Sequence, residues 1–331
     1  MRTRTLGTTG PTVSAMGLGA MGLSGAYGAT DRSEAIATVR AALEAGTTLI
    51  DTGDFYAMGH NELLLAEALR GRDRDGYQLS VKFGGLSGPG MSFTGVDCRP
   101  ESVKNFLAYS LTRLGTEYVD IYRPARLDPT VPIEETVGAI KDMVDAGYVR
   151  HIGLSEVDAA TIRRAHAVHP IADLQIEYSL VSRAVEAEVL PTLRELGIGM
   201  TPYGVLSRGL LSGHWAAAPV TAPGDMRALL PRFSAEHVEH NLALAEALRR
   251  VAEAKGRTVA QLAIAWVAAQ GSDIVPLVGA RTRGRLGEAL PAFDIDLTPE
   301  DLAAIEEAVP PGAARGDRYP TPMMSGLGVG N

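Results

Sequence analysis

The sequence predicts an α/β fold of the (β/α)8 or TIM-barrel type, and three observations lead to this prediction. Helix-like and strand-like segments alternate along most of the chain of 331 residues. Strand-like segments begin near residues 15, 47, 78, 118, 149, 172, 198 and 274. Most of these starts are about thirty residues apart, which is typical of successive βα units. Since no linker or low-complexity tract divides residues 1–331, the eight units are expected to close into one barrel domain.

The first units show the alternation clearly. Segment 31–46, DRSEAIATVRAALEAG, has Asp31 three residues before Glu34 and ends at Gly46, which predicts a capped amphipathic helix. In this half of the chain, strands are expected at 14–22, 47–52, 77–85, 118–122 and 149–155, and further helices at 61–71, 99–115 and 133–147.

The second half continues the repeat, with three exceptions along the chain. Strands are expected at 172–179, 198–204 and 273–280, and helices at 158–168, 186–197, 234–256, 258–271 and 283–293. Residues 2–14 are expected to form a small hairpin that caps the bottom of the barrel. The Gly/Pro/Ala-rich stretch 207–233 is expected to be a lid or binding loop. Residues 310–331 are expected to form a flexible C-terminal tail.

Composition and charge exclude several classes of function. The net charge of −8 and the pI of about 5.4 argue against a nucleic-acid partner, which requires a basic surface. No apolar run approaches the length of a membrane span, so we expect a cytoplasmic protein with no membrane partner. The single cysteine, Cys98, excludes an internal disulfide and a cysteine-based zinc cage. His237 and His240 lack a third ligand nearby, so no metal site is expected.

Polar residues follow two neighbouring strands of the predicted barrel. Asp51 and Tyr56 stand in LIDTGDFY, at the end of the second strand, and Lys82 stands at the end of the third. Catalytic residues of TIM barrels lie at such strand ends. A lysine there requires an acidic partner, which Asp51 can supply, and a lysine beside Tyr56 would lower the phenol's pKa, as suits a general acid. A purely structural ion pair at the barrel mouth is the alternative.

Two further segments indicate a bound anion or ligand. GLGAMG, residues 17–22, matches G-x-G-x-x-G, but no helix begins directly after it, so it predicts a loop close to a ligand rather than a dinucleotide fold. After the eighth strand, Arg281, Arg283 and Arg285 gather at the start of a helix, where cations oppose the helix dipole. A phosphate there would resolve this conflict, and barrels commonly bind phosphate near strands seven and eight.

Taken together, these segments resemble the aldo-keto reductases, in particular the branch of pyridoxal reductase-like enzymes and potassium-channel β subunits. The resemblance spans nearly the whole chain and rests on GLGAMGLSG, LIDTGDFYAMGHNELLLAEAL, VKFG, HIGLSE, IEYS, TPYGVLSRGLLSG and PLVGARTRGRLGEAL. It implies a barrel that holds NADPH/NADP+ across its mouth and reduces a small-molecule carbonyl compound by hydride transfer.

The resemblance also implies a role for individual residues. Asp51, Tyr56 and Lys82 match three members of the family's catalytic tetrad, with Tyr56 donating the proton, while Asp54 helps to hold the loop. The matching cofactor positions are Ser155 and Gln175 at the carboxamide, Tyr203 stacked on the nicotinamide, Leu206, Ser207 and Arg208 over the pyrophosphate, and Arg285 and Glu288 at the 2′-phosphate and adenine, with Gly279 and Arg281 beside them. Ala125 and Tyr27 are assigned to the substrate pocket.

Three positions depart from the family's pattern. Glu156 and Ala289 stand where asparagines often contact the carboxamide and the adenine. Ala125 stands where relatives commonly have the tetrad histidine, directly before an arginine, so the tetrad is incomplete. A second interpretation therefore stays open, in which the protein is an NADPH-binding sensor or regulatory subunit with weak catalysis. The physiological substrate and the oligomeric state are not fixed by the sequence.

Overall fold

The computed structural model describes residues 1–89, 93–215, 224–324 and 326–330, and it places eight parallel strands in one sheet. Their order is β11-β10-β9-β8-β5-β4-β3-β12. The strands are β3 (Gly17–Gly19), β4 (Leu49–Gly53), β5 (Gln78–Phe83), β8 (Val119–Pro124), β9 (Val149–Ser155), β10 (Ile171–Gln175), β11 (Gly199–Met200) and β12 (Leu277–Gly279). A parallel bridge between Met200 and Ile274 joins the two ends of the sheet. The (β/α)8 barrel predicted from the sequence is therefore confirmed.

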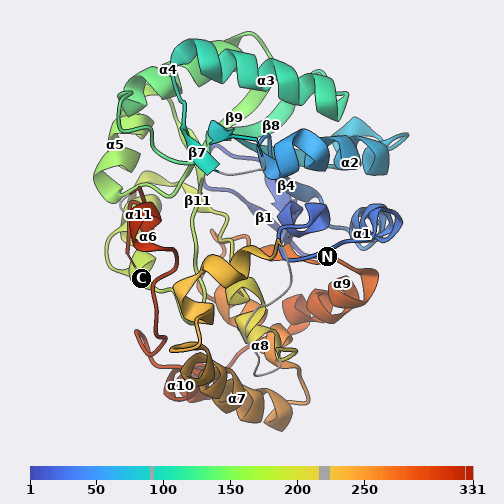
Figure 1. Ribbon diagram of the computed structural model, residues 1–331, viewed down its shortest axis with the longest axis vertical. Helices are drawn as coiled ribbons and strands as arrows, with labels where there is room; N and C mark the ends of the chain where they lie inside the picture. The colour runs from blue at the N-terminus through green and yellow to red at the C-terminus, as the bar shows by residue number, and fades with distance from the viewer. Residues whose placement is uncertain (90–92, 216–223, 325, 331) are drawn as a thin grey trace.

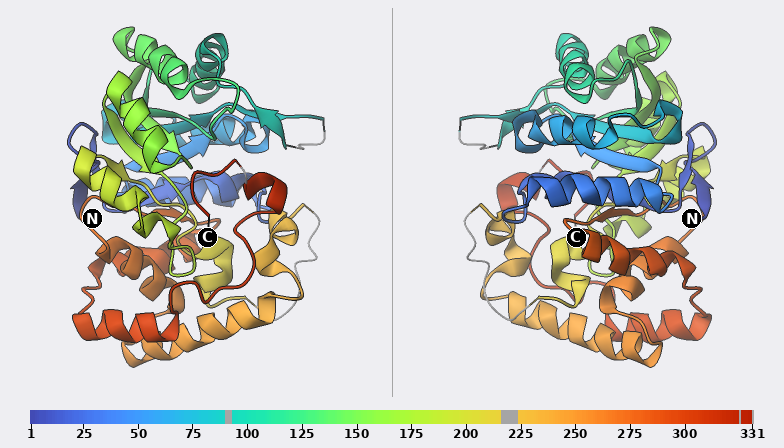
Figure 2. Two further views of the ribbon diagram at one scale, coloured as in Figure 1. Left: turned by 90° about the vertical axis from the view of Figure 1, so that its left-hand side faces the viewer. Right: turned by 90° about the vertical axis from the view of Figure 1, so that its right-hand side faces the viewer.

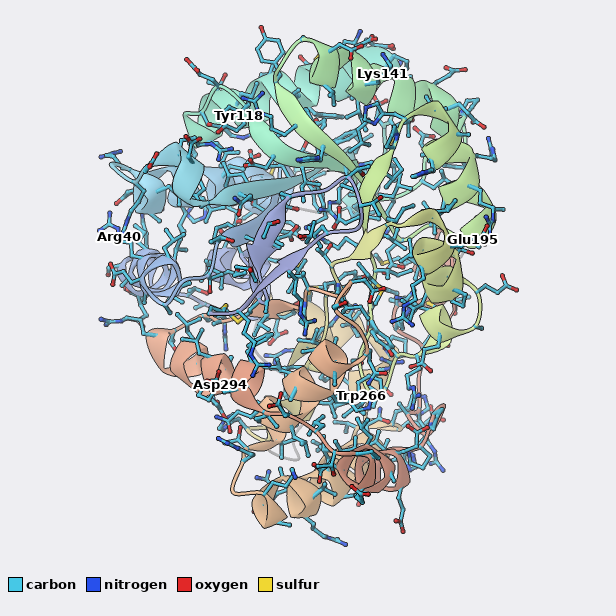
Figure 3. The ribbon with its side chains drawn as sticks, turned by 180° about the vertical axis from the view of Figure 1, so that it is seen from behind. Arg40, Tyr118, Lys141, Glu195, Trp266 and Asp294 are labelled. Atoms are coloured by element: carbon cyan, nitrogen blue, oxygen red, sulfur yellow. The ribbon has the colours of Figure 1, made fainter. Side chains whose placement is uncertain are left out.

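Helices surround the strands on the outside of the barrel (Figure 1). They are α1 (Arg32–Glu44), α2 (His60–Leu69), α3 (Pro100–Leu114), α4 (Ile133–Asp145), α5 (Ala159–Val168), α6 (Val189–Leu196), α7 (Val238–Ala254), α8 (Val259–Ala269), α9 (Arg283–Ala289), α10 (Pro299–Ala308) and α11 (Thr321–Met324). Asp31 caps α1 by accepting the backbone N–H of Glu34 at 2.7 Å, as predicted. Ion pairs such as Arg163–Glu195 and Lys141–Asp145 lie on the outer helix surfaces (Figure 3).

The hairpin of β1 (Thr3–Thr5) and β2 (Thr12–Ser14) lies at the N-terminal ends of the barrel strands. Its Leu6 packs in an apolar cluster with Val13, Leu49, Ile121, Val275 and Leu277. A larger apolar core fills the space between the sheet and the helices, and it includes the buried Trp266 of α8, whose ring packs on Tyr178 (Figure 3). The bottom of the barrel is thus sealed, which leaves the C-terminal ends of the strands as the open mouth.

Segments outside the repeat cover that mouth. A short antiparallel hairpin, β6 (Gly85–Ser87) with β7 (Phe93–Val96), follows β5 and was not predicted from the sequence. The expected lid 207–233 forms short 3-10 turns at 207–212, 226–229 and 231–233, while residues 216–223 of it lie outside the described residues.

Within the described residues, no helix is long and apolar enough to cross a membrane.

The C-terminal segment packs back onto the barrel. Figure 2 shows it, in red, running from α10 against the middle of the molecule. The backbone N–H of Gly328 donates to the carbonyl of Glu156 at 2.9 Å. Arg318 and Tyr319 are both buried. The expected flexibility of residues 310–331 stays a prediction, but the described part of this segment contributes side chains to the barrel mouth.

Candidate active site

Asp51 and Lys82 meet at the C-terminal ends of two neighbouring strands. β4 and β5 are paired in register, with Gly53 opposite Lys82, so both side chains reach the barrel mouth from adjacent positions. Both are buried, and they form an ion pair. The Asp51 carboxylate also accepts hydrogen bonds from the Ser80 hydroxyl at 2.8 Å and from the Gln175 amide at 2.7 Å. The acidic partner that the sequence requires for Lys82 is thus Asp51.

A second buried ion pair supports the first from inside the barrel. Arg123 on β8 pairs with Asp173 on β10 at 2.9 Å, and both side chains are fully buried. The same guanidinium donates to the Ser80 hydroxyl at 2.9 Å, and Ser80 in turn donates to Asp51. Because a buried charge is costly unless it is paired and hydrogen-bonded, this connected network holds the Asp51 carboxylate in place.

Tyr56 lies beside this network, just beyond the end of β4. The Lys82 ammonium is 5.1 Å from the centroid of its ring. Burial raises the pKa of Tyr56 well above its usual value, and the Asp51 charge raises it further, while Arg126 lowers it. The sequence-based expectation of a lowered pKa is therefore wrong for the protein without ligands, because desolvation outweighs the nearby cations. The phenol carries its proton at neutral pH, which is the form that a proton donor needs.

Asp54 has a different environment from Asp51. Its backbone N–H donates to the Lys82 carbonyl at 2.9 Å, which ties the loop after β4 to β5. Burial, together with the charge of Glu62, raises the pKa of Asp54 to about 8. Its Oδ1 atom is buried without a hydrogen-bond partner among the described residues. The backbone of Asp54 thus holds the loop, while its carboxyl group is protonated near neutral pH.

Ala125 and Arg126 follow the end of β8, next to Lys82. The backbone N–H of Ala125 donates to the Phe83 carbonyl at 2.8 Å, and the Ala125 side chain is buried. The guanidinium of Arg126 donates to the Ala125 carbonyl at 2.6 Å and lies 3.4 Å from the hydroxyl of Tyr319. His151 of β9 does not replace the absent histidine, because it lies near the bottom of the barrel, where Asp120 and Thr9 are its neighbours.

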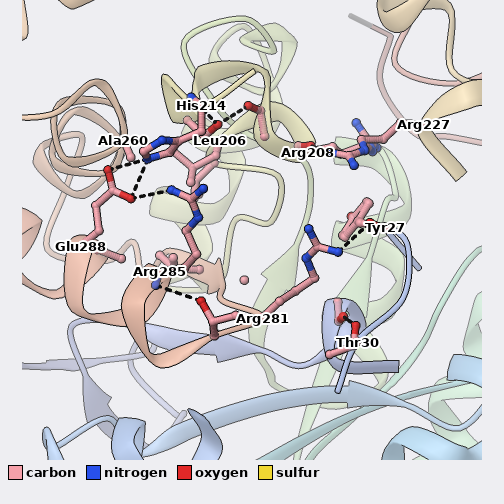
Figure 4. A pocket seen from close by; sticks show the side chains of 18 of the residues that line it. Tyr27, Thr30, Leu206, Arg208, His214, Arg227, Ala260, Arg281, Arg285 and Glu288 are labelled. Atoms are coloured by element: carbon pink, nitrogen blue, oxygen red, sulfur yellow. Dashed lines mark hydrogen bonds and ion pairs between the residues drawn. The ribbon is translucent and has the colours of Figure 1, made fainter. Parts of the chain in front are cut away.

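A cavity of about 880 Å³ opens beside the mouth (Figure 4). Among the residues expected at the cofactor, it is lined by Leu206, Arg208, Gly279, Arg281, Arg285 and Glu288, and Gly22, Tyr27 and Ala289 also line it. Other residues expected at the catalytic centre and the cofactor do not line this cavity; they include Tyr56, Lys82, Ser155, Gln175, Tyr203 and Ser207. The cavity is of the size that binds small ligands, and Tyr27, which lines it, also raises the pKa of Tyr56.

Two of the three predicted arginines project into this cavity. Arg281 donates to the backbone carbonyl of Tyr27 at 2.7 Å (Figure 4). Arg285 lies 3.2 Å from the carboxylate of Glu288, and the same carboxylate lies 2.9 Å from the imidazole of His214. Arg283 instead pairs with Glu34 of α1 at 2.9 Å and does not line the cavity. The sequence could not distinguish the arginines that face the cavity from the one that does not, because all three lie within five residues and only the fold determines where each side chain points.

Two buried hydroxyls near the mouth have no hydrogen-bond partner among the described residues. They belong to Ser155, at the end of β9, and to Ser207, in the loop after β11. Burying a hydroxyl without a partner costs free energy. Both residues stand at positions expected to contact the cofactor, so a ligand with polar groups at the mouth would satisfy them. The Gln175 amide donates to Asp51, which leaves its carbonyl oxygen for such a ligand.

A buried cluster of charges at the mouth was not foreseen as a unit. Glu177 pairs with Arg208 at 2.8 Å and lies 3.5 Å from Arg232. Glu156 pairs with Arg318, which comes from the C-terminal segment, at 2.9 Å. Burial alone would raise the pKa of Glu177, but these arginines hold it at about 2.

Glu156 explains one departure from the family's pattern. Its φ angle is +53°, a left-handed conformation that asparagine adopts more readily than glutamate. The bidentate contact with Arg318 and the hydrogen bond from the Tyr203 hydroxyl at 2.7 Å hold it there. Arg318 and Tyr319 were missed because they stand in a Gly/Pro-rich tail. The only sequence feature that marks them is an arginine and an aromatic residue side by side in a segment with few large side chains.

Other candidate groups lie away from the mouth. Cys98 is buried, and burial raises the pKa of its thiol to about 12, so it is not a thiolate at neutral pH. His240 is bound to the Ala313 carbonyl at 2.8 Å. Over the part of the chain that the structure describes, no group of three or more histidine, cysteine and acidic side chains is arranged to hold a metal ion.

Comparison with known proteins agrees with this geometry. Residues 15–310 match the model of the aldo/keto reductase family. A probable aldo-keto reductase of Glycine max is 42% identical over 315 residues, which is 95% of this chain and 90% of the relative. Among solved structures, a glycerol dehydrogenase of Gluconobacter oxydans has a TM-score of 0.83 at 28% identity, covering 92% of this chain and 94% of that one. An aldo-keto reductase of Bacillus halodurans in its holo form has a TM-score of 0.78 at 25% identity, covering 95% and 98%.

Proposed function

The chain belongs to the aldo/keto reductase family, and we propose that it reduces aldehydes or ketones to alcohols with NADPH. The observation that carries this proposal is the position of the Tyr56 phenol, which is partly buried beside the Asp51–Lys82 ion pair at the mouth of the barrel. Within the family, the motifs quoted above favour the branch of pyridoxal reductase-like enzymes and potassium-channel β subunits.

The residues around the cavity fit a nicotinamide dinucleotide phosphate. Arg281 and Arg285 project into the cavity and carry the positive charge that a 2′-phosphate requires. The unpartnered hydroxyls of Ser155 and Ser207 supply polar groups on the side of the catalytic residues. When bound, the cofactor supplies the hydride. Tyr203 offers its ring as a stacking surface, because its hydroxyl is fixed by Glu156.

The protein's own residues then account for the proton. Tyr56 donates its phenolic proton to the carbonyl oxygen as the carbonyl carbon accepts the hydride. The positive charge of Lys82 stabilises the tyrosinate that remains. Asp51 keeps Lys82 protonated in a buried site where desolvation lowers the pKa of the ammonium. Ser80 and Gln175 hold Asp51 in the orientation that makes this contact.

A second function is favoured by Ala125, which lacks the hydrogen-bonding group of the usual histidine. In this alternative the protein binds NADPH tightly but turns over carbonyl compounds slowly, as a sensor or regulatory subunit. One experiment separates the two. NADPH affinity is measured by fluorescence titration, and NADPH oxidation is followed with a broad panel of aldehydes and ketones that includes 4-nitrobenzaldehyde. Oxidation above background supports the reductase, whereas tight binding with no oxidation for any carbonyl supports the sensor.

A further inference from the structure

We propose that Arg126 and Tyr319 form a subsite for a carboxylate, so that the favoured substrates are aldehydes or ketones that also carry a carboxylate group. The inference rests on the proposed reductase function, because it concerns the substrate of the same mouth. It is carried by one observation above all: Arg126 is a charged group beside Tyr56 that lacks an acidic partner among the described residues.

The position of Arg126 places it at the reacting end of the substrate. It directly follows Ala125, the first residue after β8, which is the strand next to the one that carries Lys82. Tyr56 and Lys82 both respond to its charge, so its guanidinium lies close to the proposed proton donor. It is only partly exposed, which strengthens any charge-assisted hydrogen bond that it makes.

The hydrogen bonds of Arg126 are incomplete. A guanidinium has five N–H donors. Arg126 donates to its neighbour's carbonyl, that of Ala125, and makes a long contact of 3.4 Å with the Tyr319 hydroxyl. No carboxylate of the described residues lies within ion-pair distance of it, and the charge of Glu156, which is paired with Arg318, acts on it from farther away. Donors remain, therefore, for a group brought by a ligand.

Four arginines with buried side chains, inside the barrel or at its mouth, differ from Arg126 in this respect. Arg123 pairs with Asp173, Arg208 and Arg232 with Glu177, and Arg318 with Glu156. Burying a charge without a partner is costly, and each of these four is matched accordingly. Among the described residues of the mouth, Arg126 and Arg281 lack a carboxylate within ion-pair distance. Arg281 lines the cavity assigned to the cofactor, whereas Arg126 acts on the pKa of Tyr56 and lies where a substrate would reach.

Tyr319 supplies the second group of the subsite. Its hydroxyl lies 3.0 Å from that of Tyr203, and its ring lies under the guanidiniums of Arg208 at 4.7 Å and Arg126 at 5.7 Å. The neighbouring Arg318, paired with Glu156, fixes the segment that carries it. Tyr203 gives its own hydroxyl proton to Glu156, so the Tyr319 hydroxyl donates to Tyr203, and it would exchange that hydrogen bond for one to an anion that Arg126 binds.

A carboxylate matches this subsite better than a phosphate ester. A carboxylate can take two parallel hydrogen bonds from the planar guanidinium, and its single charge matches that of one arginine. A phosphate monoester brings about 1.5 to 2 charges at neutral pH, more than one guanidinium can balance. Ala125, which has a methyl group in place of an imidazole, leaves room for the substrate beside the carbonyl.

The test compares two aldehydes that differ in charge. The kcat/KM of the full-length protein is measured for 4-carboxybenzaldehyde and for its neutral methyl ester, methyl 4-formylbenzoate. We expect the acid to be preferred by about ten-fold to a hundred-fold, the value of one charge-assisted interaction. The preference should fall to near one in Arg126→Gln, persist in part in Arg126→Lys, and weaken in Tyr319→Phe. Arg257→Gln, at an exposed arginine far from any proposed role, should retain the preference of the wild type.

A binding measurement separates failure of the subsite from failure of the proposed function. Calorimetry measures the affinity of the wild type and Arg126→Gln for the two product alcohols, 4-(hydroxymethyl)benzoate and its methyl ester, with cofactor present. If neither aldehyde is reduced but the acid binds more tightly through Arg126, the subsite stands and the reductase function fails. If both aldehydes are reduced equally well, the subsite is wrong and the function stands. An equal fall in kcat/KM for the acid and the ester in Arg126→Gln would also overturn the subsite, since Arg126 would then act on the carbonyl group that both aldehydes share.

Discussion

Lys82 and Asp51 form an ion pair at the barrel mouth in which both side chains are about 95% buried, with exposed fractions of 6% and 5%. The pair joins β5 to β4 and is extended by Ser80 and Gln175 on the Asp51 side. A buried pair of this kind contributes little net stability over an apolar pair of the same shape, yet removing one partner is strongly destabilising. Its presence next to Tyr56 is therefore better explained by the chemistry of the phenol than by folding.

Replacing Lys82 by methionine tests this explanation. Lys82→Met should lower the free energy of unfolding by about 3 to 5 kcal/mol, because Asp51 is left buried and unpaired, and it should lower turnover nearly as much as loss of Tyr56. Urea unfolding and steady-state kinetics measure the two effects. The double variant Asp51→Asn/Lys82→Met should regain much of the stability but not the turnover. Lys104→Met, at an exposed ion pair with Asp142, is the matched control. A double variant with normal turnover would show that the pair is structural only.

The choice of cofactor should depend on Arg285. Arg285→Ala should weaken NADPH binding by about ten-fold to a hundred-fold, because it removes a charge-assisted contact to the 2′-phosphate. NADH binding should change little, since NADH lacks that phosphate. Fluorescence titration gives both affinities. Arg283→Ala is the control, because Arg283 does not line the cavity, although its partner Glu34 does, and it should affect either affinity much less than Arg285→Ala does. Equal affinity of the wild type for NADH and NADPH would contradict the proposal.

Asp54 should make the protein less stable as the pH rises. Its pKa is raised to about 8 in the folded state from an ordinary value of 3.8. The folded protein therefore binds the extra proton, and the stability that this provides is complete below about pH 4 and lost as the pH rises through about 8. The side chain introduced by Asp54→Asn cannot titrate. As the pH rises from about 4 to about 8, the free energy of unfolding of Asp54→Asn should therefore increase relative to that of the wild type, by up to about 1.4 kcal/mol per pH unit.

Urea unfolding of wild type and variant at about pH 5 and about pH 8 measures this difference. Asp97→Asn provides the control, because hydrogen bonds from Arg99 lower the pKa of Asp97 to about 2, below the window. The effect of that substitution should be the same at both pH values. A pH-independent effect of Asp54→Asn would show that Asp54 is ionised in the folded protein.

Ala125→His should restore a hydrogen-bonding group beside the carbonyl. One donor of this kind is commonly worth about 2.7 to 4 kcal/mol in acyl-transfer sites, so even part of it should raise turnover of small aldehydes measurably. The larger side chain should also exclude the largest aldehydes that the wild type accepts. Kinetics on a size-graded aldehyde series test both effects, with NADPH affinity expected to stay nearly unchanged. A variant that is neither faster on small aldehydes nor slower on large ones would place Ala125 outside the carbonyl site.

Local patterns in the sequence were sufficient for the barrel and for the pairing of Asp51 with Lys82. The cap at Asp31 and the helical periodicity after it depend on residues that are close in the chain, and parallel strands bring their carboxyl ends to one edge. The contact of Arg318 with Glu156 could not be predicted in this way, because 162 residues separate the partners and nothing local links them.

Electrostatic details were equally beyond the sequence. The pattern placed a cation near Tyr56 but gave no measure of burial, and burial decides the direction of the pKa shift of this phenol. In the same way, the sequence marked three arginines after the last strand, but only the fold shows that Arg281 and Arg285 enter the cavity while Arg283 turns to α1. Composition and spacing name the groups, whereas their environment depends on contacts between distant segments.

The central claim is that Tyr56 donates the proton while a hydride passes from NADPH to the carbonyl carbon, and isotope transfer tests it most directly. The protein is given NADPH deuterated at C4 of the nicotinamide ring on the transferred face, with an aldehyde that the wild type accepts, and mass spectrometry of the alcohol measures the label. The wild type should place deuterium on the carbinol carbon. Tyr56→Phe should bind NADPH as the wild type does but form labelled alcohol about 10² to 10⁴ times more slowly. Unlabelled product from the wild type, or labelled product formed equally fast by Tyr56→Phe, would contradict the account.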